Sequence, residues 1–140
     1  MARRIKAVFD TNIFISAILF GGNLRMCLEL ARNKEIKLIT SRAILLEVAI
    51  KLKEKFEWES SEIADVIEGI GKFAKIAEPK EQIDLISQDP QDNRILEAAL
   101  EGKVDYIISG DKKHILSLKK FEEIEIVSAQ DFLNIHYKKN

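Results

Sequence analysis

Short apolar runs and segments with helical spacing alternate along this chain. Apolar runs that are almost continuous are typical of strands buried in a parallel sheet. We expect five such strands, at residues 5–9, 36–39, 75–77, 105–108 and 125–127. Between them, apolar residues recur at helical spacing. This alternation predicts an α/β fold with a mainly parallel sheet and right-handed crossovers.

Capping signals mark where several of the intervening helices begin. Ser41 is a suitable N-cap for a helix that runs to about Phe56. Asp89 occupies an N-cap position and Pro90 the first helical position, which is a typical helix start. The other helices are expected at residues 13–20, 24–31, 60–73, 112–118 and from 128 onward. A polar tail at 136–140 is expected to fray.

Length and composition fit one domain, 1–140, with a substantial core. Of the 140 residues, 46% are hydrophobic and 32% charged. A lone cysteine, Cys27, allows neither an internal disulfide nor a zinc motif, so we expect a core residue and a cytoplasmic protein. Asp10 and Asn12 interrupt the N-terminal apolar run, which excludes a signal peptide. No stretch is long enough to span a membrane.

The charge balance constrains how this chain can bind a polyanion. Lys and Arg total 22 and Asp and Glu total 23, which gives a net charge of −1. Such a chain has no overall basic field that would attract nucleic acid. Binding to a polyanion would therefore need a local basic patch or a metal ion.

Three aspartates stand where the carboxyl ends of strands meet helix starts. Asp10 follows the first strand, Asp92 lies in the first turn of the helix that begins at 90, and Asp111 follows Ser109-Gly110 after a buried strand. Ligands bind at this edge of open α/β sheets. The structural alternative for each is a helix cap or a charge at the positive end of a helix dipole. Periodicity alone favours an exposed position for Glu47, opposite the apolar stripe of its helix. That predicted stripe consists of Leu45, Val48, Ala49, Leu52 and Phe56.

Four carboxylates gathered at one edge would repel one another unless a divalent cation bound them. Oxygen ligands without histidine or thiolate suit Mg²⁺ or Mn²⁺. The acids that would form this group are Asp10, Glu47, Asp92 and Asp111.

Four motifs follow one another over nearly the whole chain: residues 8–12 (VFDTN), Glu47 on an early helix, residues 92–99 (DNRILEAA) and residues 106–112 (YIISGDK). In this order they resemble the PIN-domain ribonucleases. The most similar group is the PIN-family toxin components of prokaryotic toxin–antitoxin pairs. The resemblance implies a three-layer sandwich, with about five mainly parallel strands and helices on both faces.

The same resemblance implies function. Asp10, Glu47, Asp92 and Asp111 would be the catalytic, metal-binding acids for Mg²⁺ or Mn²⁺. Supporting hydrogen bonds would come from Asn12 and Ser109. The expected reaction is endonucleolytic cleavage of single-stranded RNA that leaves 5′-phosphate and 3′-hydroxyl ends. A protein antitoxin and a homodimer are the expected partners.

One departure from the family pattern concerns the residues after Asp111. Many relatives carry a further acid there, whereas this chain has Lys112, Lys113 and His114. The number of metal ions, one or two, is therefore open. We interpret His114 as a partly exposed helix residue and Lys112 and Lys113 as candidate phosphate contacts. Other candidate contacts are Lys51, Lys53, Lys55, Lys119 and Lys120.

Other functions fit the sequence less well. A haloacid-dehalogenase-like phosphatase would need a second aspartate two residues after Asp10, where Asn12 stands. A receiver domain would need paired acids at the first strand and a late lysine. A catalytically silent PIN-like scaffold that binds RNA or protein is the non-enzymatic alternative, and the complete set of four acids argues against it.

Overall fold

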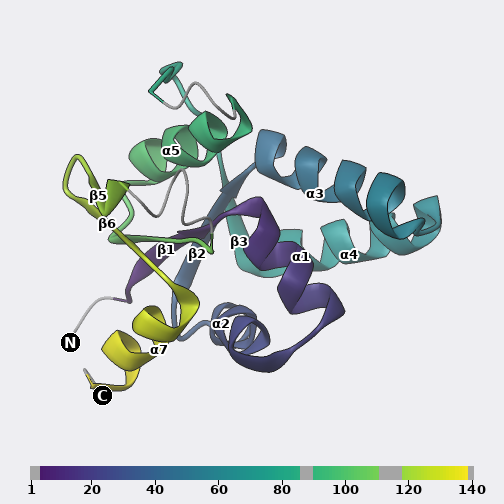
Figure 1. The fold of residues 1–140 in the computed structure, drawn as a ribbon, viewed down its shortest axis with the longest axis horizontal. Helices are drawn as coiled ribbons and strands as arrows, with labels where there is room; N and C mark the ends of the chain where they lie inside the picture. Colours follow the sequence, from purple (N-terminus) through teal and green to yellow (C-terminus); the bar gives the residue numbers. More distant parts are fainter. Residues whose placement is uncertain (1–3, 86–89, 111–117, 139–140) are drawn as a thin grey trace.

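Within residues 4–85, 90–110 and 118–138, which are those that this computed structural model describes, the chain forms a six-stranded sheet in the order β3-β2-β1-β4-β6-β5 (Figure 1). The strands are β1 (Lys6–Phe9), β2 (Lys37–Ser41), β3 (Ala74–Ala77), β4 (Tyr106–Ile108), β5 (Lys120–Phe121) and β6 (Ile124–Val127). The helices of the described residues are α1 (Thr11–Leu19), α2 (Gly22–Arg32), α3 (Arg42–Phe56), α4 (Ser60–Phe73), α5 (Pro90–Gly102) and α7 (Ala129–Lys138).

All strand pairs are parallel except β5 with β6. Val8 of β1 pairs with Ile39 of β2 on one side and with Ile107 of β4 on the other. Every residue of these three strands is buried except Lys6 and Lys37 at the amino ends of β1 and β2, and most are apolar, as expected for parallel strands between two helical layers. Their carboxyl ends consequently meet at one edge of the sheet.

Helices cover both faces of the sheet. Figure 1 shows α5 on one side of the strands and α2 and α7 on the other. Helix α5 packs against β1 and β2, whereas α1 packs against α2, and α2 against α7. Helices α3 and α4 form an arm beside the sheet, in which α3 contacts both α1 and α4. This is the predicted three-layer α/β sandwich.

The core lies on both sides of the central strands. Phe9 and Phe14 are fully buried with ring centroids 5.5 Å apart, and they join the end of β1 to α1. On the opposite face, α5 approaches β2 so closely that a Cβ atom at Gly102 would lie 2.7 Å from Cγ2 of Ile39. Glycine at 102 therefore allows the carboxyl end of α5 to pack tightly on the sheet.

Ser41 caps α3 as predicted, because its Oγ accepts a hydrogen bond of 3.3 Å from the amide of Ile44. Helix α4 begins at Ser60, as predicted, after a capping box in which the Glu62 carboxylate accepts from the Glu59 amide. Helix α5 begins at Pro90, but Asp89 and residues 112–117 of the helix expected at 112–118 lie outside the described residues.

The structure also corrects some details. The pattern missed β5, whose two residues are too few to show a period. Helix α7 includes residues 136–138 of the tail expected to fray, and His136 is 6% exposed. The apolar stripe predicted for α3 ended at Phe56, but Phe56 is 40% exposed and the buried side chains are Ile44, Val48 and Leu52.

No single helix in the described part of the chain is both long and apolar enough to cross a membrane; α1 and α2 reach that length only together, with a bend of 102° between them.

Candidate active site

Asp10 lies at the carboxyl end of β1, in the centre of the sheet edge, and is 4% exposed. Its Oδ1 accepts a hydrogen bond of 2.9 Å from the amide of Ile13 and so caps α1. Its Oδ2 accepts a hydrogen bond of 2.5 Å from Oγ of Ser109, which follows β4. Hydrogen bonds from two different elements therefore fix the orientation of this carboxylate.

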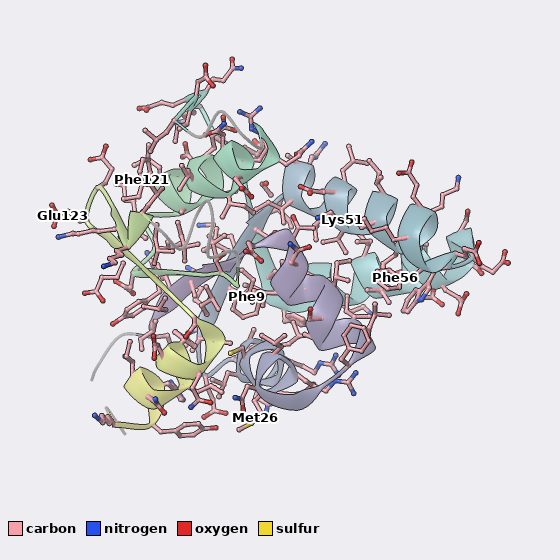
Figure 2. The ribbon with its side chains drawn as sticks, in the orientation of Figure 1. Phe9, Met26, Lys51, Phe56, Phe121 and Glu123 are labelled. Atoms are coloured by element: carbon pink, nitrogen blue, oxygen red, sulfur yellow. The ribbon has the colours of Figure 1, made fainter. Side chains whose placement is uncertain are left out.

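Glu47 lies beside Asp10 because the next residue along the chain, Thr11, donates a hydrogen bond of 3.3 Å from Oγ1 to Oε2 of Glu47. The other oxygen, Oε1, forms an ion pair of 3.2 Å with the ammonium of Lys51, one turn later on α3. Lys51 also donates to Oδ1 of Asn12 at 3.0 Å. Figure 2 shows Lys51 on the side of α3 that faces α1.

The exposure predicted for Glu47 from periodicity is wrong, since its side chain is only 15% exposed. The cause is the rotation of α3 about its axis. The helix buries Ile44, Val48 and Leu52 instead of a stripe that reaches Phe56. Glu47 precedes Val48 and follows Ile44 by three positions, so it lies next to the buried stripe.

Asp92 lies at the same edge of the sheet, on the face that α5 covers. It lies in the first turn of α5, which packs against β1 and β2. Asp92 is half-buried and its Oδ2 is inaccessible to solvent. The partial positive charge at the amino end of α5 stabilises the ionised carboxylate at this position.

A polar face of α5 anchors the preceding segment. Oδ1 of Asn93, which is 1% exposed, accepts from the amide of Leu85 at 3.0 Å. One turn later, Oε2 of Glu97 accepts from the amide of Ile83 at 2.8 Å and pairs with Arg94 at 2.9 Å. These contacts tie residues 83–85 to the helix that carries Asp92.

The donor atoms suit a hard divalent cation. Asp10, Glu47 and Asp92 offer only carboxylate oxygens, the ligands that Mg²⁺ and Mn²⁺ prefer. Within the described residues, however, no three acidic, histidine or cysteine side chains are grouped closely enough to hold a metal ion. The fourth predicted acid, Asp111, and its neighbours Lys112, Lys113 and His114 lie outside the described residues.

Comparison with known families gives the arrangement a context. A family model described as a PIN domain matches residues 6–113. The chain belongs to the PIN-domain family. Its sequence is also 30% identical over 121 residues to an uncharacterized protein of Methanocaldococcus jannaschii, covering 83% of this chain and 76% of that protein.

A solved structure extends the likeness to three dimensions. The PIN domain resembles a chain in the crystal structure of VapBC2 from Rickettsia felis bound to a DNA fragment from their promoter, with a TM-score of 0.61. The match covers 87% of this chain and 97% of that chain at 13% identity. At this identity the likeness concerns the fold. PIN domains are generally nucleases, which agrees with the sequence resemblance.

The structure of this PIN domain brings Asp10, Asn12, Glu47 and Ser109 into one hydrogen-bonded cluster through Thr11 and Lys51. Sequence reasoning had considered Lys51 as a phosphate contact, but not as the partner of Glu47. The motifs at residues 8–12 and 92–99 contain Thr11, Asn93 and Glu97, but sequence reasoning assigned no individual role to any of them. The spacing of Asn93 and Glu97, four residues apart in an otherwise apolar part of α5, is the signal that could have revealed that polar face.

Proposed function

We propose that this PIN domain is a metal-dependent endoribonuclease that hydrolyses phosphodiester bonds in single-stranded RNA. The observation that carries the proposal is the linked pair of Asp10 and Glu47. Ser109 and the Ile13 amide hold Asp10, while Thr11 joins Glu47 to it. Carboxylates fixed in this way do not need to reorganise during the reaction.

Asp10, Glu47, Asp92 and Asp111 are the residues that would hold Mg²⁺ or Mn²⁺. When bound, such a cation supplies a Lewis acid that stabilises charge on the phosphoryl oxygens and favours deprotonation of the attacking water. Hydrolysis adds water across the bond between phosphorus and the 3′ oxygen, so the products carry a 5′-phosphate and a 3′-hydroxyl.

The chain's own residues orient the acids and the substrate. The Ser109 hydroxyl donates a hydrogen bond to Oδ2 of Asp10, which leaves other lone pairs of that carboxylate for a ligand. Lys51, whose side chain is 23% exposed, lies at the rim between Asn12 and Glu47. Its ammonium can donate to a phosphate oxygen of RNA from there. Asn12 is exposed and accepts from Lys51, so it fixes the position of that ammonium.

We further propose that the domain is the toxin of a toxin–antitoxin pair, forms a homodimer and acts in the cytoplasm, where its RNA substrate is found. The sequence motifs and the likeness in fold to VapBC2 support a protein antitoxin. Exposed apolar side chains offer surfaces for such contacts: Phe20 is 74% exposed, Leu46 62% and Ile50 44%.

The decisive test compares the wild-type protein with Asp92→Asn on end-labelled single-stranded RNA in Mn²⁺, Mg²⁺ or EDTA. We expect wild-type cleavage that requires the metal, and a loss of at least about 100-fold in the variant, because a charged group that stabilises the transition state is removed. Asp131→Asn, which neutralises an exposed acid in the first turn of α7, is the matched control and should cleave normally. Equal rates for wild type and Asp92→Asn would contradict the proposal.

A catalytically silent PIN scaffold that binds RNA is the second candidate. The observation that favours it is the ion pair between Lys51 and Glu47, which neutralises one of the acids. For a scaffold, RNA binding would persist without cleavage in any of the three metal conditions. Circular dichroism of the same samples would verify that the protein is folded.

A further inference from the structure

A second charged region lies at the opposite end of α5 from Asp92. There, a cleft of about 450 Å³ opens between the carboxyl end of α5 and the first three strands. Five lysines line it, together with two glutamates and a few apolar residues. We call this site the lysine cleft after its five lysines, which are Lys6, Lys37, Lys75, Lys80 and Lys103.

The strand register places three of these lysines on one face of the sheet. Lys6 of β1 pairs with Lys37 of β2, and Lys75 of β3 pairs with Ile39 of β2. Paired residues in a parallel sheet point to the same side, and residues two apart on one strand do so as well. Since Ile39 contacts Gly102 of α5, all three lysines lie on the α5 face.

The five lysines of the lysine cleft outnumber its two glutamates, so positive charge is in excess among the described lining residues. None of its five lysines forms an ion pair there, whereas Lys51 pairs with Glu47 and Arg94 with Glu97. Repulsion from Lys75 is the main cause that lowers the pKa of Lys37, followed by partial desolvation and by Lys6 and Arg4. The ammonium groups are therefore close enough to repel one another.

Of the two glutamates that line the cleft, Glu78 is exposed and forms no ion pair within the described residues. The other, Glu101, and the neighbouring Asp105 accept hydrogen bonds from backbone amides. Oε1 of Glu101 accepts from the backbone amide of Lys80 at 3.2 Å, and Oδ2 of Asp105 accepts from the backbone amide of Lys6 at 2.9 Å. Both carboxylates thus hold backbone amides of residues that line the cleft. A bound anion would relieve the repulsion that they leave in place.

We propose that the lysine cleft binds the phosphate backbone of single-stranded RNA and acts as a holding site remote from the cleavage site. The proposal rests on the nuclease function proposed above. Ten residues of α5 separate Asp92 from Gly102, which corresponds to roughly 15 Å along the helix. At ~3.4 Å per nucleotide of a stacked strand, roughly four nucleotides connect the two ends.

The lining of the cleft favours a backbone contact over recognition of bases. None of the described lining residues is aromatic, so no side chain there can stack on a base. Lysine is a flexible point charge that suits successive phosphates of an extended strand. Across β1, β2 and β3 the lysines span two strand spacings, about 9.6 Å, which exceeds one phosphate group. The expected binding is consequently independent of base sequence and strongly dependent on salt.

The test measures RNA binding without cleavage. Lys37→Ala/Lys75→Ala is made in an Asp10→Asn background, and the anisotropy of a labelled single-stranded RNA that is long enough to span α5 is followed in EDTA. We expect the Kd to rise about tenfold and the slope of log K against log salt to fall by about 1.4, because two phosphate contacts are lost. Lys72→Ala/Lys138→Ala, which removes two exposed lysines of α4 and α7, should stay within about twofold of the parent.

An unchanged Kd and salt slope in the Lys37/Lys75 variant would overturn the proposal, as would an equal loss in the control. A loss confined to duplex DNA, measured in parallel, would overturn RNA as the occupant. The binding assay and the nuclease assay can fail independently of each other. RNA binding that depends on the cleft without any cleavage would refute the nuclease alone, and metal-dependent cleavage with unchanged binding would refute the holding site alone.

Discussion

The two ends of α5 lie in regions of opposite charge, and these regions are organised in different ways. At its amino end, Asp92 lies at the same sheet edge as Asp10 and Glu47, where the carboxylates are buried or half-buried and Asp10 and Glu47 are held by donors from other elements. At its carboxyl end, lysines without ion pairs in the described residues surround an open cleft. The first arrangement fixes the positions of carboxylate oxygens, and the second provides positive charge on flexible lysine side chains.

This difference shows why a net charge of −1 says little about nucleic-acid binding by this chain. Carboxylates lie near the amino end of α5 and lysines near its carboxyl end, and the net charge does not reveal this separation. Chemistry on a phosphodiester requires carboxylates in defined positions, whereas holding a polyanion requires only nearby positive charge. The helix dipole of α5 matches both ends, since its positive end faces the acids and its negative end faces the lysines.

The largest effect in the following series concerns the donor to Asp10. Ser109→Ala removes the hydroxyl that orients Oδ2, and we expect cleavage to fall by 10- to about 100-fold, as for other groups that orient a metal ligand. A Mn²⁺ titration should show a matching loss of affinity, which a merely structural role would not cause.

Ser128→Ala is the control for that experiment, because the Ser128 hydroxyl also forms a hydrogen bond, accepting from the Asp131 amide at 3.1 Å, but lies at the start of α7. It should reduce stability without changing cleavage or Mn²⁺ affinity. Equal cleavage by Ser109→Ala and wild type would mean that the acidic end does not depend on a fixed Asp10.

The next prediction concerns the anchoring of α5. Glu97→Ala leaves the Ile83 amide without its acceptor and Arg94 without its carboxylate, so we expect the free energy of unfolding to fall by ~2 kcal/mol. Urea denaturation measures this loss. Glu123→Ala removes a carboxylate that is 98% exposed at the hairpin tip, where Figure 2 shows it, and should change stability little. If both variants were equally stable, the polar face of α5 would not be an anchor.

The smallest expected change concerns Cys27 of α2, which reports whether the core between α2 and α7 stays closed. Burial raises the pKa of its thiol from 9.0 to about 12, against a smaller opposing effect of a backbone hydrogen bond. The folded protein therefore holds the thiol proton more tightly than the unfolded chain. The resulting stability is present below pH 9 and is lost as the pH rises towards 12.

We expect Cys27 to react with a thiol reagent at pH 8 only as fast as the protein opens, in the wild type and in Ser109→Ala alike. Fast labelling of the folded wild type would contradict its burial. Fast labelling of the variant alone would mean that its loss of activity reflects an opened core.

Sequence patterns predicted most of the fold because burial of strands leaves continuous apolar runs. The positions of Asp10 and Asp92 at the sheet edge were predictable for a similar reason, since Asp10 follows a buried strand and Asp92 lies in the first turn of a helix. Glu47 shows the limit of this approach. Its exposure depends on the rotation of α3 against α1, which a contact between helices decides and a helical wheel does not.

The lysine cleft was beyond sequence reasoning for another physical reason. Lys6, Lys37 and Lys75 are separated by about thirty or more residues and become neighbours only through strand register. Nothing in the local sequence of each lysine differs from that of a solvated surface residue. The same holds for the hydrogen bond from Thr11 to Glu47, which joins the start of α1 to the second turn of α3.

Single-turnover cleavage over a range of protein concentrations tests the division of labour between the two ends of α5 most directly. Asp92→Asn should lose the rate at saturation while its half-saturating concentration stays near that of the wild type. Lys37→Ala/Lys75→Ala should raise the half-saturating concentration about tenfold and keep the saturated rate. A result in which both variants change the same parameter would contradict the account that one end cleaves RNA and the other holds it.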